Sequence, residues 1–365
     1  MKKASPAPDL YKTKQHFEIL DGLRGVAALA VVIFHFMEWI FPDFSKNFIA
    51  HGFLAVDFFF CLSGFVVGYA YDNRVESMGL WEFFKIRLIR LHPLVFLGAV
   101  LGLLALLLDS FALPHNYGGG KLLLLFLASA FLIPWPSMED RAFNIFGLNA
   151  PSWSLFWEYV ANIFYALILI RMGRRALIGL TILSAALLVY VSYSAGNLLG
   201  GWNGDTFWHG GARIAYSFSA GLLIYRSNWI IKNNTGFPSL ALILSFAFLM
   251  PWTAWNWLTE VLVVLLFFPL IVALGAGSIL ENSWKSICRF SGNISYPLYM
   301  THYAVMWIFG NWYTTQNPAP AELYTAVFGG IALLVVFAYL AMRFYDLPVR
   351  RYLNKVWRTG PKSPG

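Results

Sequence analysis

Apolar runs separated by short polar or basic stretches repeat along almost the whole sequence. Their approximate bounds are 22–41, 52–71, 92–112, 121–135, 152–171, 175–194, 208–226, 238–253, 257–277, 291–312 and 321–342. A run of about 18–20 residues with few charges is long enough to cross a bilayer as a helix. The pattern therefore predicts an all-α, polytopic transmembrane helix bundle with no soluble domain.

Basic residues fall into clusters between the apolar runs, and these clusters orient the chain. If every cluster faces the cytoplasm, an even number of crossings must separate each one from the next. This holds everywhere except between Arg90 and Arg171, where three apolar segments would make an odd number of crossings. The weakest, 121–134, is only 14 residues long, which favours a re-entrant or interfacial segment over a full span. We therefore predict about ten spans plus one re-entrant segment.

This topology places both termini in the cytoplasm, as an N-terminal tail (1–17) and a C-terminal tail (353–365) around a membrane domain (18–352). The composition agrees, because 59% of the residues are hydrophobic and 12% are charged, against roughly 25% charged in soluble domains. The net charge of +8 lies in short clusters, not along a nucleic-acid-binding face. The two cysteines and the histidines show no disulfide framework or metal-ligand spacing. We expect an integral protein of a bacterial inner membrane, with no metal.

The first span, LDGLRGVAALAVVIFHF, carries Arg24 and His35 eleven residues apart. In a helix the two side chains face the same way, about 16 Å apart along the axis. Arg24 then lies near the cytoplasmic headgroups and His35 near the middle of the bilayer, with Glu38 one turn beyond. A buried histidine satisfied by a neighbour is the plain alternative. Charged groups inside spans are costly, so a functional role for this aligned pair is favoured.

A polar stripe follows one face of the fifth span, PSWSLFWEYVANIFYAL, where Ser154, Glu158, Asn162 and Tyr165 recur at helical spacing. The plain interpretation is hydrogen bonding between helices. A carboxylate is harder to explain in that way. Glu158 is therefore a candidate for catalysis, approaching the depth of His35 from the other side of the membrane.

The segment after the second span, WEFFKIRLIRLHP, resembles a short interfacial helix and places Arg87 and Arg90 one turn apart, close to Lys85. Orientation of the chain by positive charge explains such residues without any ligand. Two guanidinium groups at this spacing also form a forked site for phosphate. The spacing alone does not decide between these two interpretations.

Three further polar features are candidates for substrate binding. Near the end of the chain, SGNISYPLYMTHY places Ser295, Tyr299 and His302 on one helical face. Arg213 is a lone cation in the seventh span, and Asp57 interrupts the apolar run of the second. None of the three is decisive alone.

Several strings, taken together and in this order, resemble the signature regions of the acyltransferase-3 family of integral membrane O-acyltransferases. They are LDGLRGVAALAVVIFHF, AVDFFFCLSGFVVG, IRLIRLHP, WSLFWE, ARIAYSFSAG and SYPLYMTHY, and they extend from about residue 18 to 352. By this resemblance the essential arginine and histidine of the family fall on Arg24 and His35, and its R-x-x-R pair falls on Arg87 and Arg90. The acidic residue of W-S-L-x-x-E falls on Glu158.

The resemblance implies an enzyme that moves an acyl group, usually acetyl, from acyl-CoA to a hydroxyl of a glycan, a lipid-linked sugar or another acceptor. His35, Glu158 and Arg24 are the expected catalytic residues, with His35 as general base and Glu158 orienting it or binding the sugar. An acyl-imidazole on His35 is the alternative. The residues expected to bind acetyl-CoA are Arg87, Arg90 and Lys85, and those expected to bind the acceptor are Ser154, Trp153, Arg213, Tyr299, His302 and Asp57.

Some relatives in this family carry an extra extracytoplasmic domain, and we expect none here. In that case a separate extracytoplasmic partner protein is a candidate for completing the transfer. A proton-coupled transporter or flippase also places His, Glu and Arg in spans, and it is the alternative function. It would more often show repeated halves or broken spans, and neither is evident. The sequence does not specify the acyl chain, the acceptor or the oligomeric state.

Overall fold

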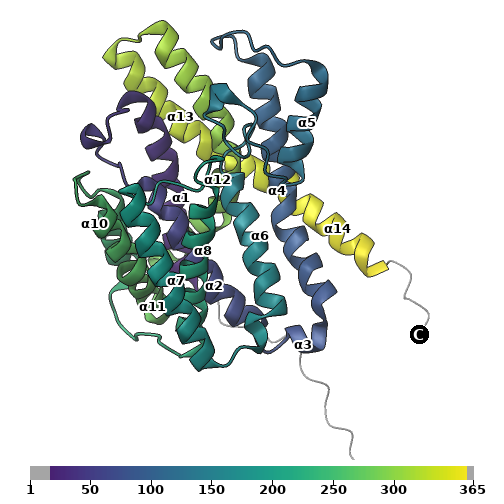
Figure 1. The fold of residues 1–365 in the computed structure, drawn as a ribbon, viewed down its shortest axis with the longest axis vertical. Helices are drawn as coiled ribbons and strands as arrows, with labels where there is room; N and C mark the ends of the chain where they lie inside the picture. Colours follow the sequence, from purple (N-terminus) through teal and green to yellow (C-terminus); the bar gives the residue numbers. More distant parts are fainter. Residues whose placement is uncertain (1–16, 360–365) are drawn as a thin grey trace, which may run out of the picture.

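The structure is a computed structural model that describes residues 17–359, and it is helical throughout apart from connecting loops and two isolated β-bridges (Figure 1). Its α-helices are α1 (Glu18–Ile40), α2 (Ala55–Tyr71), α3 (Val75–Met78), α4 (Leu80–Leu108), α5 (Gly119–Ala130), α6 (Ser152–Leu167), α7 (Arg174–Ala195), α8 (Phe207–Arg226), α9 (Gly236–Phe248), α10 (Asn256–Leu262), α11 (Phe268–Gly277), α12 (Asn282–Gln316), α13 (Pro320–Ala341) and α14 (Leu347–Thr359).

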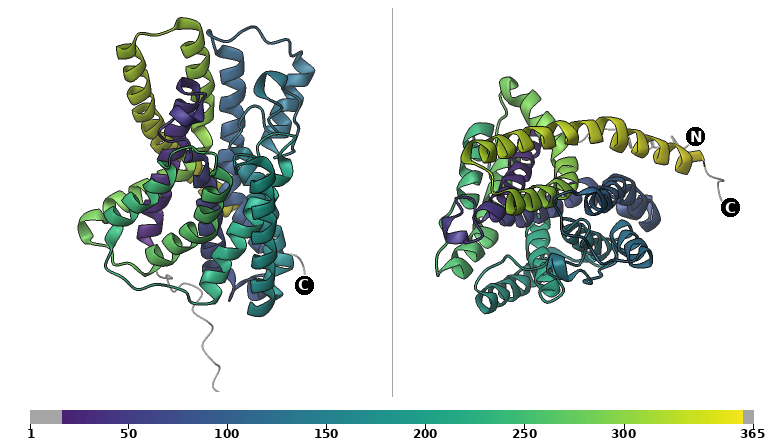
Figure 2. Two further views of the ribbon diagram at one scale, coloured as in Figure 1. Left: turned by 60° about the vertical axis from the view of Figure 1, so that its left-hand side comes forward. Right: turned by 90° about the horizontal axis from the view of Figure 1, so that it is seen from above.

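Short helices of other types complete the fold. The 3₁₀ turns are η1 (Phe44–Lys46), η2 (Gly52–Leu54), η3 (Glu139–Arg141) and η4 (Leu169–Arg171). Two π-helical turns, η5 (Val263–Phe267) and η6 (Met342–Asp346), join α10 to α11 and α13 to α14. Beyond η6, α14 extends past the side of the bundle (Figure 2).

Every predicted apolar run corresponds to a helix, so the all-helical prediction is confirmed for residues 17–359. Seven helical stretches are long and apolar enough to cross a membrane: Glu18–Ile40, Gly52–Tyr71, Leu80–Leu108, Ser152–Arg171, Arg174–Ala195, Asn256–Gly277 and Pro320–Trp357. Of the other predicted spans, α9 has only 13 residues, and α8 and α12 carry more polar side chains. The count of ten crossings therefore stays a prediction.

One expected boundary was wrong. The segment with Arg87 and Arg90 is not a separate interfacial helix, because α4 continues from Leu80 through Pro93 to Leu108. Proline within membrane helices is tolerated when neighbouring groups satisfy the freed backbone carbonyl. The expected C-terminal tail is helical as far as Thr359, as the last part of α14. The expected N-terminal tail lies outside the described residues except for Phe17, and so does the part of the C-terminal tail after Thr359.

The segment predicted at 121–134 forms α5, a helix of 12 residues that packs on α4. At 1.5 Å per residue it is about 18 Å long, short of the roughly 30 Å of a bilayer core. A full span by this helix alone is thereby excluded. Its expected re-entrant placement in the membrane stays a prediction.

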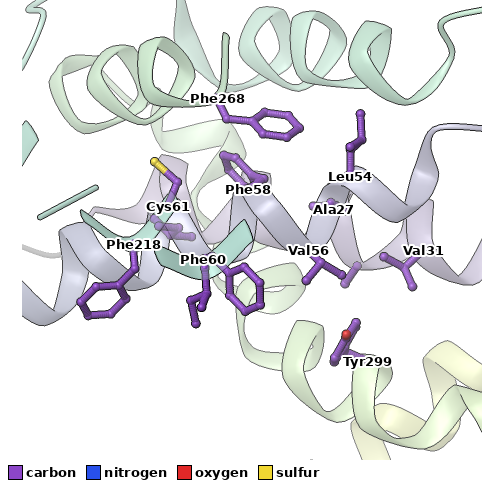
Figure 3. Packing of buried hydrophobic residues seen from close by; sticks show 14 of the residues in the cluster. Ala27, Val31, Leu54, Val56, Phe58, Phe60, Cys61, Phe218, Phe268 and Tyr299 are labelled. Carbon is purple, nitrogen blue, oxygen red and sulfur yellow. The ribbon is translucent and has the colours of Figure 1, made fainter. Parts of the chain in front are cut away.

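The core is built on two close helix pairs, α1 with α12 and α2 with α8. Glycines allow the second pair to touch backbone to backbone. A Cβ on Gly64 would lie 2.0 Å from the carbonyl oxygen of Phe218, and one on Gly221 would lie 1.9 Å from that of Cys61. Small residues at such crossings are typical of helices packed within membranes. Figure 3 shows the aromatic and aliphatic side chains that fill the space around this crossing.

Candidate active site

Two cavities lie within the bundle, with volumes of about 410 and 320 Å³. The larger is formed toward the N-terminal end of α1 and the smaller toward its C-terminal end, so that Arg24 lines the first and His35 the second. Among the residues that the structure describes, only Val56 and Tyr299 line both. The two cavities are therefore neighbours, and these two side chains form part of the partition between them.

The larger cavity, here called the basic cavity, is lined by four arginines from three separate helices. They are Arg24 of α1, Arg87 and Arg90 of α4, and Arg350 of α14. Three of the four are paired with carboxylates. Arg90 is exposed toward the cavity and, within the described part of the chain, makes no hydrogen bond or ion pair. Its guanidinium is the group most available to an anionic ligand.

Arg87 is buried and held by Glu158 of α6. Its Nη2 lies 2.7 Å from Oε1 of that carboxylate, which also accepts a hydrogen bond of 3.0 Å from Ser63 Oγ. Removing either partner would leave a charge in a poorly solvated place, which is strongly destabilising. Glu158 thus holds Arg87 at the cavity wall. This pairing could not be predicted from local sequence patterns, because the two residues are 71 positions apart.

Arg24 is fixed by the facing helix α12. Its Nε donates to Ser295 Oγ at 2.8 Å, and its Nη2 donates to the carbonyl of Gly292 at 2.7 Å. Asp21, one turn earlier on α1, lies 3.2 Å from the same Nη2. Arg24 is therefore presented to the basic cavity in one orientation.

Two residues of this cavity were missed by the sequence analysis as ligand candidates. Asp346 in η6 is buried and pairs with Arg350, with distances of 2.7 and 2.6 Å between guanidinium and carboxylate. Both line the basic cavity. In the sequence Arg350 belongs to a terminal basic cluster that topology alone explains. The π-helical turn that aims it into the cavity has no signature in the sequence.

Lys85 was predicted to bind the donor, but it does not line the basic cavity. Its ammonium lies 3.4 Å from Glu82 and 5.6 Å from the ring centre of Trp357 in α14. The reason is the helical phase of α4. Lys85 and Arg87 are two residues apart and so point about 200° apart around the helix.

The smaller cavity, here called the aromatic cavity, is lined by rings from several elements: Phe34, Phe44, Phe53, Trp153, Trp202, Tyr299, Tyr303 and Trp307. Its polar lining includes His35, Glu38 and Arg141. The Arg141 guanidinium lies 4.4 Å from the ring centre of Trp307 and donates to the carbonyl of Gly147. Burial lowers the pKa of Arg141, but a guanidinium stays protonated near neutral pH.

His35 and Glu38 form the one histidine–carboxylate pair of this cavity's described lining, with 2.7 Å between Nδ1 and Oε1. Glu158, expected to orient His35, instead lies in the basic cavity against Arg87. The partner of His35 is thus supplied by its own helix, one turn away. If Nδ1 carries the proton toward Glu38, Nε2 is left as a proton acceptor.

Trp153 lines the aromatic cavity and Ser154 the basic cavity, although the two are adjacent in α6. Ser154 Oγ lies 2.8 Å from the hydroxyl of Tyr299. Of the residues predicted to bind the acceptor, Trp153, Arg213 and Tyr299 line the same cavity as His35. His302 lines neither cavity and lies behind His35.

Asp57 and Arg213, both predicted to bind substrate, form an ion pair with each other. Both are almost wholly inaccessible, and the guanidinium contacts both carboxylate oxygens, at 3.0 and 2.6 Å. Arg213 also donates to the carbonyls of Gly200 and Phe53. Arg213 lines the aromatic cavity, whereas Asp57 lines neither cavity. This buried pair fixes α2 to α8, because separating the two ions would leave a buried charge without its partner.

A second buried pair, His51 with Glu260, lies outside both cavities, with 3.3 Å between Nε2 and Oε1. Glu260 also accepts a hydrogen bond from the backbone N–H of Leu198. Within residues 17–359, no group of three or more His, Cys, Asp or Glu side chains is arranged to hold a metal ion.

Comparison with known proteins identifies the family of this chain. A family model described as an acyltransferase domain matches residues 17–343. The chain belongs to the acyltransferase-3 family. That match contains both cavities apart from the part of the basic cavity contributed by η6 and α14.

Individual relatives are distant. "Protein 2 in picA locus" of Rhizobium radiobacter is 34% identical over 182 residues, which cover 47% of this chain and 90% of that protein. "Putative O-acetyltransferase SAR0937" of Staphylococcus aureus (strain MRSA252) is 26% identical, over 96% of this chain and 60% of that protein. "O-acetyltransferase OatA" of Staphylococcus aureus (strain NCTC 8325 / PS 47) is 24% identical, over 95% of this chain and 59% of that protein. The chain thus spans about three fifths of the staphylococcal relatives. No solved structure matches it.

Proposed function

We propose that this membrane acyltransferase moves an acetyl group from acetyl-CoA, bound in the basic cavity, to a hydroxyl of a glycan or glycolipid held in the aromatic cavity. One observation carries the proposal. The arginines expected to bind the donor line one cavity, the histidine expected to act on the acceptor lines the other, and the two cavities share a wall.

The basic cavity suits the donor. Acyl-CoA carries several phosphates, and guanidinium groups bind phosphate through paired hydrogen bonds. Arg90 has an unpaired guanidinium at the cavity surface, while Arg24, Arg87 and Arg350 are held in place by their partners. From the positive-inside rule we expect this end of the bundle to face the cytoplasm, where acyl-CoA is made.

The aromatic cavity suits the acceptor, because sugar faces stack on aromatic rings and their hydroxyls need hydrogen-bond partners. With its Nδ1 proton held by Glu38, His35 accepts the acceptor's proton at Nε2 while the acceptor oxygen attacks the thioester carbonyl. The C–S bond breaks, and CoA leaves as a thiolate that takes the proton. An acyl group carried briefly on the same nitrogen is the other route, and it uses the same residues.

Donor binding is tested with purified protein in detergent, by following thermal unfolding as acetyl-CoA is added. Arg90→Ala is the primary variant, because it removes a donor contact without leaving a carboxylate unpaired; Arg87→Ala/Arg90→Ala extends the test. Arg289→Ala is the matched control, since that exposed arginine pairs with Glu18 and lines neither cavity. We expect acetyl-CoA to stabilise the wild type saturably. Its affinity should fall at least tenfold in Arg90→Ala and stay unchanged in the control. No stabilisation by acetyl-CoA, free CoA or longer acyl-CoAs would favour the transporter.

The acceptor half is tested separately with His35→Ala in native membranes, which contain the acceptor. We expect acetyl-CoA binding to persist while acyl transfer falls about 10²- to 10⁴-fold, the usual contribution of a general base. A variant that keeps full transfer activity would exclude both catalytic roles for His35.

A further inference from the structure

Two side chains form part of the partition between the two cavities. Val56 of α2 and Tyr299 of α12 each line both cavities, although each is mostly buried. Figure 3 shows both side chains among the buried residues of the core. Both side chains therefore lie at the boundary between the basic cavity and the aromatic cavity.

The Tyr299 side of the partition is rigid. Its hydroxyl donates to Ser154 Oγ at 2.8 Å, and Ser154 in turn donates to the carbonyl of Pro151 at 3.0 Å. The Tyr299 ring also packs edge-on against Phe59, with 5.7 Å between centroids, and lies tilted against His302, with 6.0 Å between centroids. Moving this ring would break buried hydrogen bonds and contacts together.

Val56 contributes to the partition only through the volume of its side chain. A valine side chain has no polar atom, so its contribution to the partition is the space that its two methyl groups fill. Val56 has few rotamers because it is β-branched. The width left for a passing group therefore depends on the volume of this one side chain against a fixed tyrosine ring.

We propose that Val56 and Tyr299 form an acyl gate that selects donors with short acyl chains. The inference rests on the proposed function. The reacting atoms must come within about 3–3.5 Å, so the thioester carbonyl has to reach the partition from the donor side. The acyl chain points ahead of the carbonyl and meets Val56 and Tyr299 first. An acetyl methyl fits there, whereas each added methylene holds the carbonyl further back.

The experiment compares donor chain lengths. Dissociation constants are measured by thermal unfolding titrations with free CoA and with acetyl-, propionyl-, butyryl- and hexanoyl-CoA. The proteins are the wild type, Val56→Ala and Val56→Leu. Val191→Ala is the matched control, because Val191 is a buried valine of α7 that lines neither cavity.

We expect the wild type to bind butyryl-CoA about tenfold more weakly than acetyl-CoA, in line with what one or two excluded methylenes cost in a binding pocket. Val56→Ala should remove most of that difference, and Val56→Leu should extend the discrimination to propionyl-CoA. The control should match the wild type. Opposite shifts in the two Val56 variants separate a change in gate width from a general loss of folding, which weakens all donors alike.

Equal chain-length ratios in the wild type and both Val56 variants would overturn the gate and leave the proposed function standing. A wild type that binds hexanoyl-CoA as tightly as acetyl-CoA would also overturn it. Failure to bind free CoA and every acyl-CoA would overturn both proposals.

Discussion

The imidazole of His302 stacks on that of His35, with 5.2 Å between ring centroids and 27° between ring planes. His302 is fully buried, its Nδ1 lies 3.1 Å from the carbonyl of Leu298, and its Nε2 has no partner among the described residues. His35, in contrast, faces the aromatic cavity. His302 therefore supports the ring of His35 from behind, in place of the substrate contact that the sequence predicted for it.

Substitution of His302 should separate packing from chemistry. His302→Phe keeps a flat ring behind His35, so we expect acetyl-CoA binding to persist and acyl transfer to fall less than tenfold. His302→Ala leaves a void and should lower the free energy of unfolding by about 3 kcal/mol, as large-to-small changes in a packed core do. Thermal unfolding in detergent and transfer assays in membranes measure the two effects. If transfer activity falls as far in His302→Phe as in His302→Ala, a nitrogen of this ring has a chemical role.

Glu38→Gln tests the orientation of His35. The amide can still form a hydrogen bond, but it has no negative charge to stabilise the imidazolium that forms during transfer. We expect transfer to fall about 10²-fold or more while acetyl-CoA affinity is unchanged, since a neutral amide in place of the orienting carboxylate is costly in other histidine-based sites. Glu322→Gln, on an exposed helix end, is a suitable control. An unchanged rate in Glu38→Gln would show that His35 needs no carboxylate.

The Asp57–Arg213 pair should act on stability and not on substrate recognition. Asp57→Ala or Arg213→Ala leaves one buried charge alone, and we expect either variant to lose about 3–5 kcal/mol. The double variant Asp57→Leu/Arg213→Met removes both charges and should recover most of that loss. Folded yield and thermal unfolding in detergent provide the measurement. A double variant as unstable as the sum of the single ones would contradict this interpretation.

Arg350→Ala tests whether α14 contributes to donor binding. Its guanidinium reaches the basic cavity while pairing with Asp346, so its loss should weaken acetyl-CoA about tenfold. The effect should shrink in high salt, because the site is partly open to solvent. Arg351→Ala is the neighbouring control, since Arg351 does not line the cavity. Equal affinity in Arg350→Ala and the wild type would restrict the donor site to α1 and α4.

Local patterns in the sequence predicted the helices and the positions of Arg24 and His35 well, because both depend on hydrophobic run length and helical phase. Pairing could not be predicted in this way. Glu158 could equally have met His35 or Arg87, and Asp57 lies 156 residues from the arginine that neutralises it. The contribution of Asp346 depends on a π-helical turn, and the separate cavities of Trp153 and Ser154 depend on how α6 docks. Such features follow from tertiary packing, which no run of neighbouring residues specifies.

The contact between α2 and α8 also bears on how this protein can move. Gly64 and Gly221 bring the two backbones together so closely that not even one added carbon fits on either side, and the Asp57–Arg213 pair ties the same two helices. An alternating-access cycle that moves α2 against α8 would have to break the contact between these two helices and separate two buried charges in every turnover. A catalyst with fixed walls avoids that cost: small acyl groups travel through it while the helices stay in place.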